Sequence, residues 1–199
     1  MLKLHYLNGF VPQTHAIFLP ANIAVTPITG ELAAGDHEVG NIYDSSGGLK
    51  KTLWVSDAGA AVHDALMSGL ADAGLKPVAL DAATDAKDLQ PGIDLMLSCE
   101  LEQLAVEKNF AAPQTIHGQY FTMTARARLR FTLRRRDGST LYQSEITGAE
   151  DEPPKPVGAE AFLPLETEPA ESLSVAMSRA IGTLLIDPKF RAAFPLRSP

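Results

Sequence analysis

The sequence has one cysteine, one tryptophan and no long uninterrupted run of apolar residues. A lone cysteine cannot form an internal disulfide, and Cys99 stands within an alternation of apolar residues, which predicts a buried and unreactive thiol. Nothing approaches the ~18 consecutive apolar residues that a transmembrane helix needs. The N-terminal segment carries one positive charge and no apolar core, so it does not resemble a secretory signal. We therefore expect either a cytoplasmic protein or a periplasmic protein from which a signal has been removed.

The usual signatures of metal sites and of catalysis are also missing. The five histidines are scattered, and no two have the i,i+3 or i,i+4 spacing of helical zinc ligands, so the sequence predicts no metal site. It has no Gly-x-Ser-x-Gly motif, and its glycines fit no phosphate-binding loop. The acidic pairs Asp36/Glu38 and Glu100/Glu102 could form a carboxylate site, but a solvated strand face or loop explains them better. We predict that the protein is not an enzyme and has no cofactor.

The composition is that of an ordinary globular protein. Hydrophobic residues make up 45% and charged residues 21% of the chain, and the net charge of −7 argues against binding to nucleic acid. A chain of 199 residues is long enough for one well-packed domain. We predict an N-terminal arm or edge strand over residues 1–20 and a single domain over residues 21–195.

The strongest pattern is a strict alternation between residues 120 and 136. Odd positions from Phe121 to Leu133 are apolar and even positions are polar, which predicts a long strand with one buried face. Asp137-Gly138 then predicts a two-residue hairpin turn, and residues 140–148 form the return strand. This register pairs apolar residues on one face and opposite charges on the other, namely Leu133 with Tyr142, Leu129 with Ile146, and Arg130 with Glu145.

The remaining elements follow from periodicity. We predict strands over 21–28, 76–80 and 93–102, with Pro27 limiting the first to an edge or a strand end, and helices over 56–74 and 168–186, with Ser56 as the cap of the first. Residues 29–53, 108–118 and 149–170 are rich in glycine, proline or polar residues and are predicted as loops. The predicted fold is α+β: a two-layer α/β sandwich with a mixed, mostly antiparallel sheet and two helices on one face.

Positive charge is concentrated on the central strand. Arg126, Arg128, Arg130 and Arg134 share its polar face, and Arg135 and Arg136 follow. Such a face could bind an anionic partner. It could equally be a solvated sheet surface whose arginines pair with acidic residues of neighbouring strands, and we favour this second interpretation. The acidic residues concerned are Glu100, Glu102 and Glu145.

In this order of elements the chain resembles the YajG family of bacterial envelope lipoproteins and, more loosely, the auxiliary lipoproteins of ABC-type transport systems. The resemblance covers most of residues 20–195. It rests on these segments: Ile23-Ala-Val25, Ala60 to Leu66 running into Leu70 to Pro77, Ile93 to Leu97, Thr124 to Arg130, Asp137-Gly-Ser139, and Ala176 to Leu185 followed by Asp187 to Phe194.

The resemblance implies a periplasmic domain held at the outer membrane by a lipid anchor, which this sequence does not contain. Its partner would be an envelope protein or a transport complex, and its contact with the membrane would be through the anchor alone. We therefore expect a non-catalytic accessory or partner-binding domain of the bacterial envelope. The alternative is a small enzyme or small-ligand-binding protein with a site between the loops 29–53 and 149–170. A wet pocket joining those loops would favour the alternative, and an open edge strand would favour partner binding.

Overall fold

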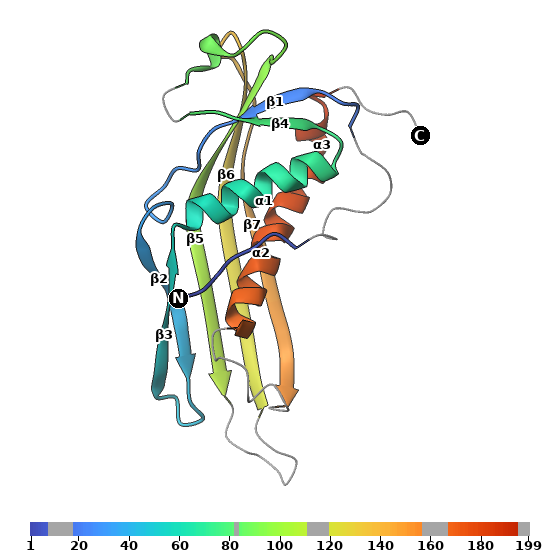
Figure 1. Ribbon diagram of the computed structural model, residues 1–199. Coiled ribbons are helices and arrows are strands. Elements are labelled where there is room, and N and C mark those ends of the chain that lie inside the picture. Colours follow the sequence, from blue (N-terminus) through green and yellow to red (C-terminus); the bar gives the residue numbers. More distant parts are fainter. Residues whose placement is uncertain (8–17, 82–83, 111–119, 157–166, 195–199) are drawn as a thin grey trace.

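The computed structural model is a seven-stranded mixed sheet with helices on one face (Figure 1). It describes residues 1–7, 18–81, 84–110, 120–156 and 167–194. The α+β two-layer sandwich predicted from the sequence is confirmed. The elements are β1 (Asn22–Val25), β2 (Asp36–Tyr43), β3 (Leu49–Ser56), α1 (Ala58–Asp72), β4 (Lys76–Ala79), a 3-10 turn (Ala86–Asp88), β5 (Leu95–Phe110), β6 (Tyr120–Arg135), β7 (Thr140–Pro156), α2 (Thr167–Ile186) and α3 (Pro188–Arg191).

The long strand β5 is the axis of the sheet. Along one side it pairs with β6 in antiparallel orientation, and β7 pairs with β6 in the same way. Its other side is shared between two smaller units. β1 pairs in parallel near the start of β5 and carries β4 beyond it, whereas β2 pairs in parallel near the end of β5 and carries β3 beyond it. β3, β4 and β7 are therefore the edge strands.

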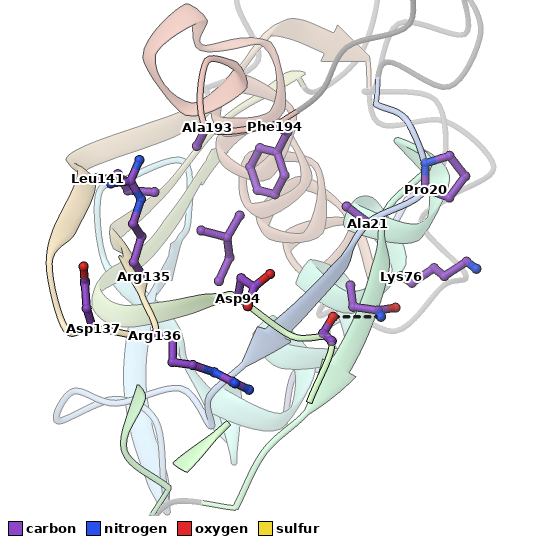
Figure 2. Close-up of a pocket in the computed structure, with 13 residues that line it drawn as sticks. Pro20, Ala21, Lys76, Asp94, Arg135, Arg136, Asp137, Leu141, Ala193 and Phe194 are labelled. Carbon is purple, nitrogen blue, oxygen red and sulfur yellow. Dashed lines mark hydrogen bonds between the residues drawn. The ribbon is translucent and has the colours of Figure 1, made fainter. Parts of the chain in front are cut away.

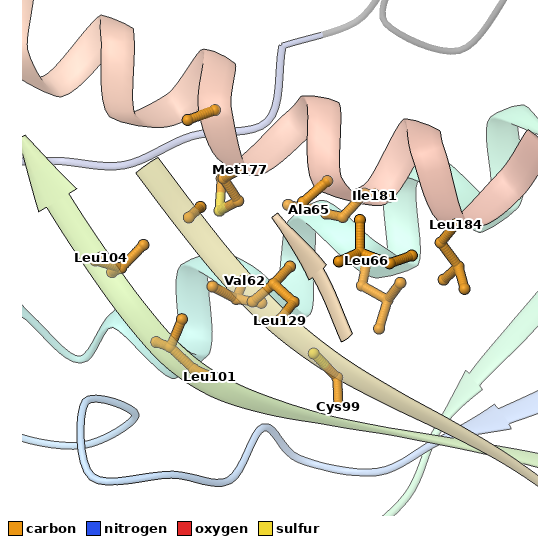
Figure 3. Packing of buried hydrophobic residues seen from close by; sticks show 14 of the residues in the cluster. Val62, Ala65, Leu66, Cys99, Leu101, Leu104, Leu129, Met177, Ile181 and Leu184 are labelled. Atoms are coloured by element: carbon orange, nitrogen blue, oxygen red, sulfur yellow. The ribbon is translucent and has the colours of Figure 1, made fainter. Parts of the chain in front are cut away.

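The core lies between the sheet and the helices α1 and α2, which cover the same sheet face (Figure 1). Figure 3 shows Val62 and Leu66 of α1 meeting Ile181 of α2 above Leu129 of β6. Glycine permits the closest contacts. A Cβ at Gly148 in β7 would lie 1.8 Å from the Ala176 carbonyl oxygen, so only glycine lets α2 approach the strand this closely. The odd-numbered apolar side chains of β6 are all buried, as predicted.

The predicted hairpin register is confirmed, and its turn is different. Leu133 faces Tyr142 and Arg130 faces Glu145. However, the Arg135 N–H donates to the Ser139 carbonyl at 2.9 Å, so the loop has three residues rather than two and a bulge follows it. The reason is local, because Gly138 takes the left-handed conformation at φ 87° and the Asp137 carboxylate accepts the Ser139 N–H.

The prediction of a long loop over residues 29–53 is wrong, since this segment contains the hairpin of β2 and β3. The prediction failed because it interpreted the glycines of this segment as loop residues. A Cβ at Gly40 would lie 1.6 Å from the Val106 carbonyl oxygen, so this glycine allows two strands to meet and does not interrupt one. The other predicted loops are also shorter than expected, because β5 continues to Phe110 and β7 to Pro156. Residues 111–119 and 157–166 lie outside the described residues.

The predicted helix cap at Ser56 is wrong as well. Ser56 is the last residue of β3, and the cap position of α1 is Asp57, which has a left-handed backbone at φ 47° and no capping hydrogen bond from its side chain. The Asp57 carboxylate instead accepts the Gly35 N–H at 3.2 Å. This bond joins the start of α1 to the turn before β2. Of the two places that Pro27 allowed for the first predicted strand, the strand end is the correct one, because β1 ends at Val25, before Pro27, and lies between β4 and β5.

The first residues form an ordered arm along α2. The Leu2 N–H donates to the Trp54 carbonyl of β3 at 2.6 Å. The backbone N–H groups of His5 and Leu7 then donate to the buried hydroxyls of Ser174 and Ser178, at 3.2 Å and 3.1 Å. Serines one helical turn apart thus give the arm acceptors at a two-residue spacing. The division of the chain at residues 20 and 21 stays a prediction.

Candidate functional site

A cavity among the described residues has a volume of about 830 Å³ and lies where β1, β4 and β5 begin and β6 ends (Figure 2). This volume falls within the ~300–1,000 Å³ of typical small-molecule sites. No described residue of the segments 29–53 or 149–170 lines it, so among the described residues it does not match the site that the alternative hypothesis expected. Its lining residues are Pro20, Ala21, Asn22, Lys76, Gly92, Asp94, Leu95, Arg135, Arg136, Asp137, Leu141, Ala193 and Phe194.

One wall of the cavity is apolar and firmly held. The Phe194 ring packs against Phe18 and Phe190, with centroid distances of 5.0 Å and 5.1 Å. Asp187 fixes the short helix α3, which carries Phe190 and leads to Phe194, because its carboxylate accepts the Lys189 N–H at 2.8 Å and the Tyr142 hydroxyl at 2.8 Å. Burial, together with this bond to Asp187, raises the pKa of Tyr142 to about 12. The wall is therefore preformed.

The charged groups of the cavity differ in how they are engaged. The Arg136 guanidinium donates to the Leu89 and Gln90 carbonyls, both at 2.5 Å, which ties the hairpin turn to the loop before β5. Asp137 is engaged within its own turn, and its bonds from Ser139 lower the pKa of its carboxyl. Across the described chain, by contrast, the Asp94 side chain forms no ion pair or hydrogen bond, and the Arg135 guanidinium forms neither and is attracted only weakly by the nearby Asp137 carboxylate.

The polar face of the central strands is neutralised by acidic residues, as we favoured. Arg126 pairs with Asp151 at 2.8 Å, and Arg128 pairs with Glu145 at 3.4 Å. Arg130 pairs with both Glu100, at 3.2 Å, and Glu102. Arg134 is exposed and has no ion pair within the described ranges. Partner binding through Arg126, Arg128, Arg130 and Arg134 stays a prediction.

The other residues that sequence reasoning singled out do not assemble into a site. Cys99 is buried at 1% exposure, and burial raises the pKa of its thiol well above the ordinary value. Of the acidic pair on β2, Glu38 accepts a long hydrogen bond from Asn41 at 3.4 Å. Within the described residues, no group of three or more histidine, cysteine, aspartate or glutamate side chains could hold a metal ion. His15 and His117 lie outside those residues.

A second surface feature is the open edge of β3. Trp54 and Leu49, which are 43% and 60% exposed, lie on this strand, and Met1, 60% exposed, adjoins it through the Leu2 bridge to Val55. Large exposed apolar side chains that gather on an unpaired strand are typical of an interaction surface. Sequence reasoning missed this edge because it assigned β3 to a loop. None of the helices in the described ranges has the length and apolar character that crossing a membrane requires.

No protein-family model matches the sequence, and no curated protein does so. Solved structures, however, share the fold over nearly the whole chain. A Xanthomonas campestris protein of the DUF330 family superposes with a TM-score of 0.58 at 12% identity, over 96% of this chain and 95% of that one.

Two further structures have a TM-score of 0.50. One is a hypothetical protein from Chlamydia trachomatis, at 8% identity over 87% of this chain and 99% of that one. The other is a neuraminyllactose-binding hemagglutinin homolog from Helicobacter pylori, at 9% identity over 93% of this chain and 97% of that one. At these identities the likeness concerns the fold alone and does not identify the YajG family. The chain therefore has the fold of a group of whole bacterial proteins.

Proposed function

We propose that this protein is a non-catalytic accessory domain of the bacterial envelope that binds a partner protein by strand addition at β3. The envelope location, periplasmic and beside the outer membrane, is supported by the resemblance to YajG-type lipoproteins. It is also supported by the fold shared with bacterial proteins that include a hemagglutinin homolog, whose name describes binding. The observation that carries partner binding is the open edge of β3.

The backbone of β3 has its free hydrogen-bonding groups on the side away from β2. The Trp54 carbonyl points outward, because it accepts the Leu2 N–H. Outward and inward groups alternate along a strand, so the N–H and C=O groups of Thr52 point outward too. In the described chain, Leu2 makes the one bridge to this side of β3, so most of the edge can accept a further strand.

The side chains of β3 indicate the chemistry of the partner. Trp54 and Leu49 offer apolar contacts. Lys51 and Lys50, whose ammonium also lies 5.0 Å from the centroid of the Phe110 ring, add positive charge near the edge in a protein whose net charge is −7. An extended segment with alternating acidic and apolar residues matches both features. The same pattern would place the acidic side chains on the face of Lys51 and the apolar ones on the face of Trp54, because these two residues have opposite parity along β3.

The single tryptophan allows a direct test, because Trp54 is the sole source of tryptophan fluorescence. The probe is an end-capped peptide of alternating glutamate and valine. We expect its addition to shift Trp54 emission to shorter wavelength as the ring is covered, and we expect an alternating lysine–valine peptide of equal length to be inactive. Thr52→Pro removes an outward N–H without removing a bond to β2, so it should abolish the shift.

Two outcomes would contradict strand addition. One is an equal response to the acidic and the basic peptide, and the other is an unchanged response in Thr52→Pro. Arg128→Gln serves as the matched control, since it changes an exposed side chain on the sheet face and leaves the β3 edge intact. The envelope location is tested separately by fractionating cells that express the protein at its natural level. Recovery in the cytoplasmic fraction would contradict it.

A further inference from the structure

Two side chains of opposite charge, those of Asp94 and Arg135, line the cavity without forming an ion pair with each other. Arg135 ends β6 and faces Leu95 across the antiparallel pair, and Asp94 is the residue immediately before Leu95, where β5 begins. The Arg136 N–H donates to the Asp94 carbonyl at 3.0 Å, and this bond fixes the two backbones relative to each other. Both side chains line the cavity (Figure 2), and the structure records no ion pair between them. The backbone thus holds an acceptor and a donor apart across the hollow.

The neighbouring charged groups are engaged elsewhere or point away from this pair. The Arg136 guanidinium is engaged with backbone carbonyls, and Asp137 is engaged within the hairpin turn. In Figure 2 the Lys76 chain leads from β4 away from Asp94 and toward the rim. Asn22 donates to the Gly92 carbonyl at 3.1 Å. Arg135 and Asp94 therefore supply the charges that a bound molecule would meet.

Between these charges the cavity offers an apolar surface. Leu95, Leu141 and Ala21 line it together with Phe194, whose ring is held by two other phenylalanines. A preformed apolar wall with a few converging polar groups is the usual design of a small-molecule site. A guanidinium binds a carboxylate through two parallel hydrogen bonds, and a carboxylate accepts hydrogen bonds from an ammonium group.

From this arrangement we propose that the cavity binds a small zwitterion with an apolar body, namely a short apolar peptide with free ends. Arg135 binds the carboxylate of the ligand, Asp94 binds its ammonium group, and the side chains of the ligand pack on Phe194 and Leu141. The volume of about 830 Å³ leaves room for more than one amino acid. This site is separate from the edge of β3, so each can fail without the other.

The test uses the full chain and the tripeptide Ala-Leu-Ala with free ends, followed by amide chemical shifts in NMR titrations. We expect saturable shifts at Ala21, Leu141 and Phe194. Arg135→Gln and Asp94→Asn should each weaken binding about tenfold, or ~1.4 kcal/mol, which is in the range for hydrogen bonds to charged groups. Acetylating the peptide should reproduce the loss in Asp94→Asn, and amidating it should reproduce the loss in Arg135→Gln.

Arg134→Gln is the matched control, because Arg134 is the adjacent residue and lies on the opposite face of β6, away from the cavity. It should bind the tripeptide as the natural protein does. The proposal is overturned if the tripeptide gives no saturable shifts at millimolar concentration. Equal losses in Arg134→Gln and Arg135→Gln would overturn it too, as would full binding of the peptide capped at both ends.

Discussion

The edge strands β3 and β7 stand at opposite sides of the same sheet and are protected in different ways. β7 lies under α2, and its solvent-facing positions carry polar or charged residues such as Gln143, Glu145 and Thr147. β3 exposes Trp54 and Leu49 instead. The polar and charged residues of β7 discourage further strands from pairing, whereas the exposed apolar residues of β3 encourage pairing and its lysines favour an acidic strand. This difference between the two edges is the one that the proposed strand addition at β3 requires.

The largest losses of stability should come from substitutions in the core that α1 and α2 cover, which includes the contact between α2 and β7. Leu66→Ala and Leu184→Ala each remove a fully buried side chain, so each should lower the free energy of unfolding by ~2–5 kcal/mol. Urea melts followed by circular dichroism measure the loss. Negligible losses at both sites would show that the two helices do not share one core.

Gly148→Ala tests the closest contact between β7 and α2. The added Cβ would overlap the Ala176 carbonyl, which is backbone and cannot rotate away. We expect the free energy of unfolding to fall by ~1–3 kcal/mol, as it does in other overpacked sites. The matched control is Gly47→Ala in the β2–β3 turn, where no atom lies within 4 Å, although its positive φ carries a small cost. Equal losses of unfolding free energy in the two variants would mean that α2 does not pack closely against β7.

Tyr142 of β7 gives a pH-dependent test of how β7 is held against the C-terminal helices. Its raised pKa, about 12, means that the unfolded chain loses the phenol proton near pH 10 while the folded chain retains it. The contribution of Tyr142 is therefore complete below pH 10 and is lost as the pH rises toward 12. The difference in unfolding free energy between the natural protein and Tyr142→Phe should shrink over that window. A difference that stays constant from pH 9 to pH 12 would contradict the assignment.

The arginine face should contribute little to stability. Arg126, Arg128 and Arg130 are all partly exposed, and exposed ion pairs contribute ~0–1 kcal/mol each. Replacing all three with glutamine should leave the urea midpoint nearly unchanged, and added salt should reduce the remaining difference. If this face instead binds an anionic partner, the triple variant will lose that partner in a salt-sensitive way. We expect no such loss.

The smallest effect on stability belongs to the β3 edge itself. Trp54→Thr replaces a side chain that is 43% exposed, so the free energy of unfolding should change by no more than ~0.5 kcal/mol. The same variant should lose partner binding. Far-UV circular dichroism and urea melts provide the first measurement. A loss of several kcal/mol would show that Trp54 belongs to the core and not to an interface.

The fold could be predicted from the sequence where one face of an element is buried and the other is exposed to solvent. The register of β6 and β7 could be predicted because a slip of one residue would turn Leu129 and Leu133 to solvent. Prediction failed where glycine has a tertiary role, since the contact between Gly40 and Val106 cannot be read locally. It also stopped early in β5, where a bulge between Leu101 and Gln103 shifts the buried positions from odd to even numbers.

The cavity could not be predicted for a related reason. Ala21, Asp94, Arg135 and Phe194 come from four distant parts of the chain, and no local pattern joins them. The run of arginines at the end of β6 was the sequence feature that could have indicated the cavity. The alternation along β6 instead indicated the solvated sheet face. Arg135 differs from Arg134 only in lying one position further along the strand. That single step carries its side chain from the solvated face to the cavity.

The proposed partner site is tested most directly by photo-cross-linking at the two edges in living cells. A photoreactive amino acid replaces Lys50 of β3 in one variant and Gln143 of β7 in the other, and both are exposed positions. The account predicts a discrete cross-linked partner at position 50 whose linked peptide is an extended acidic and apolar segment, lost in Thr52→Pro, and none at position 143. Equal cross-linking at both positions, or a cross-link at position 143 alone, would contradict it.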